Sequence, residues 1–556
     1  MTNVTEHPAT DWNVINWRTA HRKVVNLRQR IFRASREGNL KKVRSLQKLM
    51  LRSYSNTLVG VRRVTQENHG KNTPGVDKLL VKTPERRAWL VDYLMTFQPW
   101  KAKPNRRVYI PKANGKLRPL GIPSITDRAI QARVKNALEP FWEARFEGSS
   151  YGFRPGRSCH DAIQKIYLVT ASPTHKRGEW VADADIKGAF DNISHDFLLS
   201  AIGNFPAREL IRQWLKAGYV AKDVFYDTDK GTPQGGVISP LLANIALDGM
   251  EKRLTAQGQK RTVVRYADDF VILCTTREDA AQALTEFSPW LKERGLVYSV
   301  DKTRIVHITE GFDFLGWNVR KYDSTKGTRL LIRPSKDSVK RVVDKIRNEW
   351  VKGVGRKPLN KLIPAMNRII CGWSNYHRHI VAKDTFRKLD CWMFKREQRY
   401  AARKHKDKSW QWRAERYWGK FLQNRNDNWT FGDKQTGQYI WKFAWTKIKR
   451  HVMVKGTASP DDPDLKTYWQ NRTKGQTEDL WSKKWREIAK RQNGLCLRCG
   501  GNLINEEEIQ QHHINPDGGE EVNNLELVHL YCHQQISARQ ATMRAHERRQ
   551  ATRRKQ

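Results

Sequence analysis

Tyr266-Ala-Asp-Asp269 decides the fold, because its two adjacent carboxylates stand between two short apolar, β-branched runs, residues 262–265 and 270–274. Two such runs joined by a few polar residues predict a tight β-hairpin. Burying two acids side by side costs several kcal/mol unless cations or hydrogen-bond donors satisfy them. The acidic pair at the hairpin tip therefore indicates a divalent-metal site, although the tetrapeptide alone also fits a solvated Asp-Asp turn.

A third acid upstream strengthens the metal interpretation. Asp185 lies in a second strand-like run, residues 180–190. Strands that bring Asp185 beside Asp268 would supply carboxylates for two Mg²⁺ ions about 4 Å apart, the arrangement that clamps the attacking and leaving oxygens of phosphoryl transfer. Mg²⁺ suits this chemistry because it keeps few protein ligands and takes the rest from water and substrate phosphates. The pattern thus predicts a polymerase.

The formal charge of +46 over 556 residues far exceeds what solubility requires. It indicates a polyanionic partner, and nucleic acid fits because each neutralised phosphate releases counterions. No apolar run approaches the roughly 20 residues that cross a bilayer, and residues 1–7 lack a signal-peptide core. Of the seven cysteines only Cys496 and Cys499 are close in sequence, which argues against a disulfide framework. We expect a cytoplasmic bacterial protein without membrane contact, associated with the nucleoid when it acts on DNA.

The chain divides into segments of different composition. Residues 13–70 are basic and helix-like, and a mixed α/β region follows to about residue 330. Residues 340–450 hold 29 Lys and Arg against 9 Asp and Glu, and eleven of the 21 tryptophans lie between Trp373 and Trp485. Basic residues interleaved with aromatics neutralise phosphates and stack on unpaired bases, although single tryptophans there can also be packing residues. Residues 455–480, rich in Gly, Ser, Pro, Asp and Thr, predict a linker or a loosely packed segment.

Two short pairs of ligands near the C-terminus predict a zinc site. Cys496-x-x-Cys499 and His529-x-x-Cys532 give four soft or borderline ligands with the spacing of structural Zn²⁺ sites. Zinc also explains how a domain of about 70 residues could fold around a small core.

Seven motifs follow one another along the chain: Arg118-Pro-Leu-Gly-Ile-Pro123, Tyr151-Gly-Phe-Arg-Pro-Gly156, Asp185-Ile-Lys-Gly-Ala-Phe-Asp-Asn-Ile193, Gly231-Thr-Pro-Gln-Gly-Gly-Val-Ile-Ser-Pro240, Tyr266-Ala-Asp-Asp269, Lys302-Thr303 and Phe314-Leu-Gly-Trp317. Each motif alone is weak, but all of them in this order are highly specific. Over nearly its whole length the chain resembles a group II intron-encoded protein, a reverse transcriptase and maturase with a C-terminal HNH endonuclease.

The resemblance implies a multidomain α+β fold. A right-hand polymerase with fingers and an antiparallel palm sheet would be followed by an α-helical thumb (maturase domain X) and a small zinc-stabilised ββα HNH domain. We expect an N-terminal RNA-binding extension, fingers and palm, thumb and maturase domain, a DNA-binding linker region and an HNH endonuclease domain at residues 1–75, 76–335, 336–445, 446–485 and 486–556.

By the same resemblance, Asp185 and Asp268 hold both catalytic Mg²⁺ ions, and Asp269 is a nearby acid with a less certain share. Asp183 is an alternative, because alternate residues of a strand face the same side. Only the family's Asp-x-x-x-x-Phe pattern favours Asp185. Phe190 would lie under the incoming sugar, where its ring excludes the 2′-hydroxyl of a ribonucleotide. Its alternative role is that of a core aromatic.

Four further residues are implied in binding the substrate. Lys112 and Arg118 resemble the fingers residues that hold the triphosphate. A two-residue hairpin turn would pair Lys112 with Leu117 and send Arg118 to the other face, so a bulge or a longer loop is needed. Gln234 would lie against the nascent base pair, where flanking glycines allow close backbone approach. Lys302 would protonate the departing pyrophosphate, and its alternative is a solvated lysine.

His512, His513, Asn524 and His533 resemble the HNH nuclease motif. The family pattern implies His513 as the general base that activates water and Asn524 as the residue that orients the fold around it. His512 and His533 would hold one Mg²⁺ or Mn²⁺. Two positions depart from the pattern: His529 stands where many relatives carry a cysteine, and His512 where many carry an acid. Both remain workable ligands.

The resemblance implies a ribonucleoprotein that binds its intron RNA through the N-terminal extension and the thumb, which includes Gly372-Trp-Ser-Asn-Tyr376, and assists splicing. The RNA inserts into one strand of the target DNA and the HNH domain nicks the other. The freed 3′-hydroxyl then primes synthesis from deoxynucleoside triphosphates on the RNA template, a process called retrohoming. Two alternatives stay open: a maturase that acts only as an RNA chaperone, and a non-intron bacterial reverse transcriptase such as a retron or diversity-generating enzyme.

Overall fold

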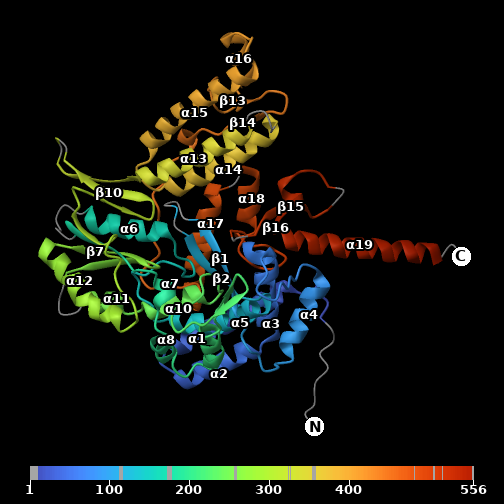
Figure 1. The fold of residues 1–556 in the computed structure, drawn as a ribbon. Coiled ribbons are helices and arrows are strands. Elements are labelled where there is room, and N and C mark those ends of the chain that lie inside the picture. Colours follow the sequence, from blue (N-terminus) through green and yellow to red (C-terminus); the bar gives the residue numbers. More distant parts are fainter. Residues whose placement is uncertain are drawn as a thin grey trace.

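The computed structural model describes residues 10–111, 115, 117–171, 178–255, 260–323, 325, 327–353, 358–480, 483–504, 507–515 and 518–553. Figure 1 shows a body that contains most of the blue and green elements, a group of long yellow and orange helices above it, and a red C-terminal helix that extends away from the body. Among the described residues, none of the helices combines the length and the apolar composition needed to cross a membrane.

The N-terminal region is a cluster of basic helices. Helices α1 (Trp17–Arg36), α2 (Leu40–Arg52) and α3 (Tyr54–Arg62) pack on α5 (Ile125–Glu143), which is buried over most of its length, and α4 (Pro84–Met95) packs on α3. Helices α1, α2, α3 and α4 are each capped by the residue that precedes them. The capping side chain accepts a backbone N–H that the helix itself leaves unpaired, and the four residues are Asn16, Asn39, Ser53 and Thr83. The helical prediction for residues 13–70 is confirmed.

The fingers sheet has the strand order β2-β1-β4-β5. Strand β1 (Asn105–Pro111) pairs antiparallel with β2 (Leu117–Ile122) and parallel with β4 (Tyr219–Ala221), which turns back into β5 (Val224–Tyr226). Ile110 pairs with Arg118 and Pro111 with Leu117, so the β1–β2 loop is longer than two residues. This register meets the condition for Lys112 and Arg118 to share a face, although Lys112 itself lies outside the described residues.

The palm sheet is antiparallel, as predicted, with the order β6-β7-β3-β8. Its strands are β3 (Trp180–Asp185), β6 (Thr262–Tyr266), β7 (Asp269–Cys274) and β8 (Arg304–His307). The apolar side chains alternate between two cores. Ala182, Phe270 and Ile272 pack on the side of α12 (Arg277–Lys292), whereas Val181, Val271 and Leu273 pack on the side of α6 (Cys159–Thr170).

Short helices complete the palm between these strands: α7 (Ala189–Asn192), α8 (His195–Ile202), α9 (Arg208–Leu215), α10 (Ser239–Ala246) and α11 (Met250–Leu254). A three-stranded antiparallel sheet, β9 (Phe312–Phe314), β10 (Trp317–Tyr322) and β11 (Arg329–Pro334), then leads out of the palm. Its residues Phe312, Trp317 and Ile332 share the α6-side core with the helices that follow, so palm and thumb are continuous in packing.

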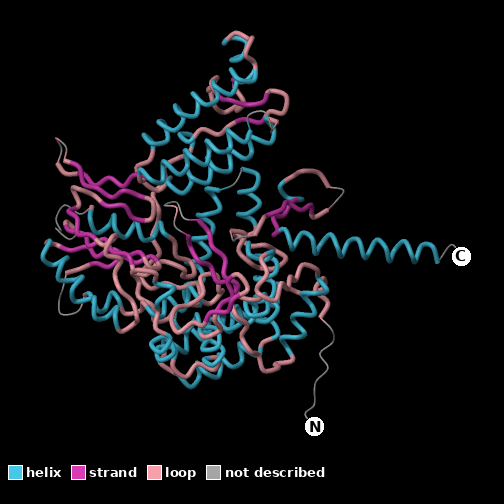
Figure 2. The backbone as a smooth tube through the Cα atoms, viewed as in Figure 1, coloured by secondary structure: helices cyan, strands magenta, loops and turns pink. Residues whose placement is uncertain are grey.

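The thumb is helical, as expected. It consists of α13 (Lys336–Gly353), α14 (Leu359–His377), α15 (Lys383–Lys404) and α16 (Trp410–Tyr417), which form the upper part of Figure 1. A small antiparallel sheet of β12 (Trp418–Gly419), β13 (Thr430–Asp433) and β14 (Gln438–Tyr439) packs against these helices. Figure 2 shows how little strand the thumb contains beside its helices.

The prediction of a loosely packed segment at residues 455–480 is wrong. Ser459, Asp461 and Asp462 are buried, and a 3-10 helix (Pro463–Leu465) leads from them into α17 (Lys466–Leu480). Asp461 accepts two hydrogen bonds from the Arg28 guanidinium, each 2.7 Å long. The polar composition reflects such buried partners in the N-terminal helices and not exposure to solvent, since buried charges persist where they are paired.

The C-terminal segment forms a ββα unit after α18 (Lys483–Arg491). Strands β15 (Ile509–His513) and β16 (Leu525–His529) are antiparallel, and α19 (Leu530–Arg553) follows β16 without a loop. Figure 2 shows the two strands beside the start of the long helix. Ile488 on α18 and Leu527 on β16 belong to the same apolar core as the N-terminal helices.

Candidate active site and metal centres

The turn between β6 and β7 brings three acids together at one end of the palm sheet. Tyr266 pairs with Asp269, so Ala267 and Asp268 form a two-residue turn. Asp185, the last residue of β3, pairs directly with Asp269 on the neighbouring strand. Cross-strand partners have Cβ atoms about 5 Å apart. Carboxylates from distant points of the chain therefore meet at the hairpin tip.

A buried framework holds this turn. Ala267 has a φ of 59°, a left-handed conformation that costs a non-glycine residue about 1–2 kcal/mol. The buried Arg265 donates from Nη1 to the Ala267 carbonyl (3.2 Å) and to Asn244 Oδ1 (3.1 Å), and Asn244 Nδ2 donates to the Gly152 carbonyl (2.9 Å). A Cβ on Gly152 would lie 2.3 Å from the Ala267 nitrogen, so only glycine fits. Gly152 thus supports the acidic turn by close backbone packing.

Burial and neighbouring carboxylates raise the pKa of two of these acids, Asp268 and Asp269. Burial, and then repulsion from Asp268 and Asp185, raises the pKa of Asp269 to about 7. Burial and the charge of Asp185 also raise the pKa of Asp268. Lys302 Nζ donates to Asp185 Oδ2 at 2.6 Å, and this hydrogen bond raises the pKa of Lys302. A set of oxygen donors with excess negative charge fits Mg²⁺, and Lys302 stays protonated beside it.

Asp183 lies on the same face of β3, two residues before Asp185. Its strand partners are Val271 on β7 and Arg304 on β8, and its Oδ2 accepts from Arg304 Nε at 3.1 Å. Burial raises the pKa of Asp183 although Arg304 opposes the change. Both acids have a cationic partner, so the distinction lies in the register: Asp185 pairs with Asp269 at the turn, whereas Asp183 pairs with Val271 two residues farther along β7.

A cavity of about 360 Å³ lies between the fingers sheet and the palm, and Phe190 and Asp191 on α7 line it. The ring of Phe190 meets the ring of Phe153 edge-on, with the centroids 6.1 Å apart. A Cβ on Gly231 would lie 2.6 Å from the Asp191 carbonyl oxygen, so this glycine lets the following loop lie on α7. Phe190 therefore forms part of the cavity wall, five residues after Asp185 in the chain.

Gln234 connects β2 of the fingers sheet with Asp191, a residue that lines this cavity. Gln234 Nε2 donates to Asp191 Oδ2 at 3.2 Å, and the Gln234 carbonyl accepts from the Gly121 N–H on β2 at 2.9 Å. Gly235, the residue after Gln234, permits β2 to approach this closely, because it has no Cβ. The positive charge of Arg118 partly offsets the rise in the pKa of Asp268, which puts its guanidinium within electrostatic reach of the acids.

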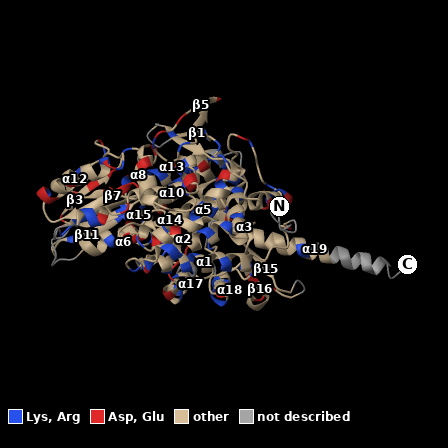
Figure 3. Cartoon of the chain, turned by 90° about the horizontal axis from the view of Figure 1, so that it is seen from below, with Lys and Arg blue, Asp and Glu red and all other residues tan. Residues whose placement is uncertain are grey.

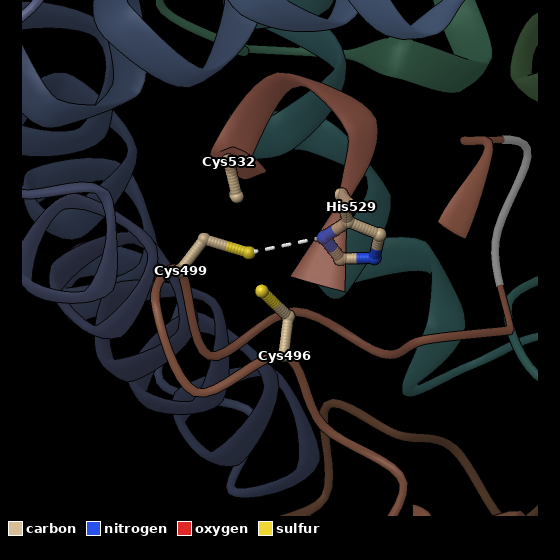
Figure 4. A group of neighbouring side chains, drawn as sticks. All are labelled: Cys496, Cys499, His529 and Cys532. Carbon is tan, nitrogen blue, oxygen red and sulfur yellow. Dashed lines mark hydrogen bonds between the residues drawn. The ribbon is translucent and has the colours of Figure 1, made fainter. Parts of the chain in front are cut away.

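The predicted zinc ligands converge. Cys496, Cys499, His529 and Cys532 are buried, and their ligand atoms lie within 4.8 Å of one another. Figure 4 shows the four side chains gathered around one point. Cys499 Sγ lies 3.3 Å from His529 Nδ1, while His529 Nε2 lies 2.9 Å from the Asn502 carbonyl oxygen. A carbonyl only accepts, so Nε2 carries the proton and Nδ1 keeps its lone pair for a metal. Three sulfurs and one imidazole nitrogen fit a tetrahedral Zn²⁺.

Arg62 on α3 reaches this cluster from the N-terminal region. Its Nη2 lies 3.4 Å from Cys532 Sγ and 3.4 Å from Glu507 Oε2, and its Nε lies 3.2 Å from Glu67 Oε1. The guanidinium also stacks on Trp17, 4.7 Å from the ring centroid. Three thiolates and a neutral imidazole around Zn²⁺ would leave one negative charge, which the buried Arg62 is placed to balance.

Two histidines of the HNH pattern face each other beside the zinc cluster. The rings of His512 and His533 meet edge-on with centroids 5.2 Å apart, while Cys532, the neighbour of His533, belongs to the zinc cluster. Burial lowers the pKa of His512 and keeps its imidazole neutral, the form that binds metals. His513, the next residue of β15, lies with its Nε2 3.1 Å from Glu520 Oε1.

Asn524 fixes the loop between β15 and β16. Its Nδ2 donates to the carbonyls of Asn515 (3.0 Å) and Gly519 (2.9 Å), and its Oδ1 accepts from the Asn515 N–H at 2.9 Å. The Asn524 carbonyl accepts from the Ile514 N–H at 2.8 Å. These bonds tie the loop directly after His513 to the start of β16, which gives Asn524 an orienting position.

Positive charge is concentrated on the thumb. Burial, and then the nearby charges of Arg399, Arg347 and Arg403, lower the pKa of Arg396, so cations from α13 and α15 crowd one another. Figure 3 shows Lys and Arg spread over many other elements as well. Cations held this closely repel one another. A polyanionic partner would neutralise this repulsion, so the arrangement favours such a partner.

Three protein families match the chain in order. The N-terminal domain of reverse transcriptase matches residues 12–94, the reverse transcriptase (RNA-dependent DNA polymerase) family matches 110–319, and the maturase-specific domain of group II introns matches 339–418. Protein YkfC of Escherichia coli K12 is 35% identical over 314 residues, which cover 49% of this chain and 82% of YkfC.

The chain belongs to the group II intron-encoded reverse transcriptase/maturase family. The group II intron-encoded protein LtrA of Lactococcus lactis is 32% identical over 293 residues, which cover 39% of this chain and 47% of LtrA. The chain thus spans about half the length of this family member. A telomerase of Candida albicans in complex with a fragment of telomeric RNA is similar over 57% of this chain and 61% of its own, at 15% identity and a TM-score of 0.33.

Several residues that support the acidic turn or the zinc cluster were not predicted from the sequence. Arg265 and Asn244 brace the acidic turn, and Arg62 contacts the zinc cluster. Arg265 directly precedes Tyr266 in an apolar run, and a lone arginine there is a signal that could have found it, since a buried cation needs partners. For Asn244 and Arg62 the sequence offers no such signal, because their partners lie far away in the chain.

Proposed function

We propose that the chain is an RNA-directed DNA polymerase that also acts as the maturase of a group II intron. The single observation that carries the polymerase is the register that pairs Asp185 with Asp269 and leaves Asp268 at the turn. These three carboxylates would hold Mg²⁺, and a bound Mg²⁺ pair activates the primer 3′-hydroxyl and neutralises the charge of the triphosphate. Both activities, DNA synthesis on RNA and assistance of splicing, are proposed from the family membership and from this geometry.

The remaining residues of the site have complementary roles in this proposal. Phe190 excludes the 2′-hydroxyl of a ribonucleotide from the cavity wall. Arg118 and Lys112 bind the triphosphate, while Gln234 lies against the nascent pair with its amide held by Asp191. Lys302 is protonated at Nζ through its contact with Asp185, so it can donate a proton to the departing pyrophosphate.

Primer extension on an RNA template with Mg²⁺ tests the polymerase. We expect Asp268→Asn and Asp185→Asn to lower deoxynucleotide incorporation by about a thousandfold or more, because each removes a carboxylate that would hold the Mg²⁺ ions. Asp183→Asn is the matched control, since Asp183 shares the face of β3 but pairs with Arg304. Full activity of Asp268→Asn, or a loss confined to Asp183→Asn, would contradict the assignment.

The maturase activity rests on the family match over residues 339–418 and on the basic thumb. The proposed partner is the group II intron RNA in a ribonucleoprotein. The alternative function is that of a chaperone without polymerase activity. A splicing assay on the Asp268→Asn variant separates the maturase function from the polymerase function. We expect that variant to splice normally and to extend no primer. If the wild-type protein supports splicing but incorporates no deoxynucleotides, the chaperone alone would be favoured.

We further propose that the C-terminal ββα unit is an HNH endonuclease with a structural Zn²⁺. The support is the convergence of four zinc ligands and the facing pair His512 and His533, which would hold one Mg²⁺ or Mn²⁺. His513 would activate water for nicking of the target DNA, and Asn524 orients the adjoining loop. Nicking of a target duplex by wild type, but not by His513→Ala with unchanged zinc content, would support this assignment.

A further inference from the structure

A buried histidine that has no part in the mechanism above contacts the loop that carries Gln234. His195 is the first residue of α8 and is 4% exposed, and its Nε2 lies 2.8 Å from the Gly231 carbonyl oxygen. A carbonyl only accepts hydrogen bonds, so Nε2 carries a proton. Burial lowers the pKa of His195, which keeps the imidazole neutral and leaves Nδ1 unprotonated. His195 thus holds the Gly231 carbonyl through a neutral N–H donor.

The peptide group between Gly231 and Thr232 is held at both of its polar ends. Its carbonyl accepts from His195 Nε2, and its N–H donates to the Phe190 carbonyl at 2.6 Å. A trans peptide group is planar, and its C=O and N–H point in opposite directions. The plane cannot turn without breaking both bonds. The histidine on α8 and the backbone of Phe190 on α7 are therefore connected through one rigid group.

Gly231 has no side chain of its own that could anchor this peptide. Its φ is 82°, and a Cβ would lie 2.6 Å from the Asp191 carbonyl oxygen, so the residue must be glycine. The Gly231 N–H donates to the Ile193 carbonyl at 2.8 Å, which keeps the start of the loop against the end of α7. The bond from His195 then sets the orientation of the peptide that follows.

Packing alone does not account for an imidazole at position 195. Nδ1 of His195 is buried and has no hydrogen-bond partner among the described residues. A buried polar atom without a partner costs free energy. An apolar side chain of similar size would fill the same space without that cost. What the imidazole adds to packing is the hydrogen bond to Gly231.

Two parts of the cavity wall depend on this peptide. Phe190 lines the cavity, and its carbonyl receives the Thr232 N–H. Gln234 follows Thr232 by two residues, and its amide donates to Asp191 Oδ2, next to Phe190 in the chain. A shift of the peptide between Gly231 and Thr232 would therefore move the proposed sugar-selecting ring and the proposed contact to the nascent pair together.

We propose that His195 is a positioning residue that sets the discrimination between deoxyribonucleotides and ribonucleotides. It acts through the Gly231 carbonyl and the Phe190 backbone and does not touch the nucleotide. This inference rests on the proposed polymerase function and adds to it a residue behind the cavity wall. Removal of the donor leaves the buried Gly231 carbonyl without its partner, so the peptide turns and the Phe190 ring loses its fixed place.

The test is single-nucleotide primer extension by the full-length protein on an RNA template, with a deoxynucleotide and the matching ribonucleotide. His195→Gln keeps an N–H donor at the reach of Nε2, whereas His195→Met has a similar length and no donor. We expect His195→Met to lower the ratio of the two kcat/KM values about tenfold and to raise KM for the deoxynucleotide, with kcat within about threefold of wild type. His195→Gln should recover most of the ratio.

Two controls separate positioning from stability. His377→Met removes another buried histidine, whose Nε2 lies 3.0 Å from Ser338 Oγ in the thumb, and it should lower the melting temperature without changing the ratio. In a Phe190→Val background, His195→Met should cause no further loss of discrimination, because the ring through which it acts is gone. His195→Asn carries a donor too short to reach Gly231 and should match His195→Met, so it serves as the second variant if His195→Met does not fold.

The outcomes distinguish this inference from the proposed function. A wild type that incorporates no nucleotide would refute the polymerase and this role with it. An active wild type with an unchanged ratio in His195→Met, or equal losses in His195→Met and His195→Gln, would overturn the positioning role alone. The same loss in His377→Met, or additive losses in the double variant with Phe190→Val, would also overturn that role and leave the polymerase standing.

Discussion

Replacing Arg62 should detach the C-terminal unit from the N-terminal helices. The Arg62 side chain is 2% exposed and lies within 3.4 Å of polar atoms of Glu67, Glu507 and Cys532. Arg62→Met keeps most of the volume but removes the buried guanidinium that contacts all three of these groups. Breaking a buried ion network by removing one partner costs about 3–5 kcal/mol. Loss of the stacking on Trp17 adds to this cost.

The cost should appear as weaker retention of zinc and easier cleavage of the C-terminal unit. We expect Arg62→Met to release Zn²⁺ to a chromogenic chelator faster than wild type, and to expose α18 or the β15–β16 loop to limited proteolysis. Primer extension should survive, because the palm acids lie in another part of the molecule. Arg63→Met is the matched control, since Arg63 is the exposed neighbour on the same turn. Equal zinc release and equal cleavage in Arg62→Met and Arg63→Met would refute the reasoning.

Three further predictions concern the polymerase and the thumb. Phe190→Val should raise ribonucleotide incorporation on the order of a hundredfold in primer extension, because the smaller side chain admits a 2′-hydroxyl; unchanged discrimination would leave Phe190 a core aromatic. Gly152→Ala should lower extension about a hundredfold at unchanged zinc content, because its Cβ would lie 2.3 Å from the Ala267 nitrogen and must displace the acidic turn; full activity would show that the turn tolerates the shift. Burial raises the pKa of Glu397 to about 8, so the folded thumb holds this proton more tightly than the unfolded chain, whose glutamates titrate near 4.5. Thermal stability should therefore fall as the pH rises from about 5 to 8, and Glu397→Gln should reduce that slope in melting curves; an identical slope would exclude Glu397 as its cause.

The sequence predicted those parts of the fold that depend on local pattern. The Tyr266–Asp269 hairpin follows from two β-branched runs around a short polar turn, and the ligand pairs at Cys496 and His529 follow from spacing. The choice between Asp183 and Asp185 required strand register, which shows that only Asp185 lies opposite Asp269. Register also showed a loop longer than two residues next to Arg118.

Features that depend on distant partners were not predictable from one sequence. Residues 455–480 have the composition of an exposed linker, yet Asp461 is buried because Arg28, more than four hundred residues earlier, pairs with it. Arg62 looks like any other cation of a basic helix until Glu507 and Cys532 lie beside it. From sequence alone, polar residues are predicted to be exposed unless their partners are known, and here the partners come from the other end of the chain.

Direct observation of the metals tests the central claim most sharply. A structure of the protein with a chain-terminated primer on an RNA template, a matched deoxynucleoside triphosphate and Mn²⁺ in place of Mg²⁺ would locate the ions by anomalous scattering. We predict two peaks about 4 Å apart between Asp185 and Asp268, with the triphosphate on the side of Arg118 and the sugar against Phe190. Ions bound elsewhere with the nucleotide in place, or a nucleotide that binds without any ion at these acids, would contradict the proposed polymerase site.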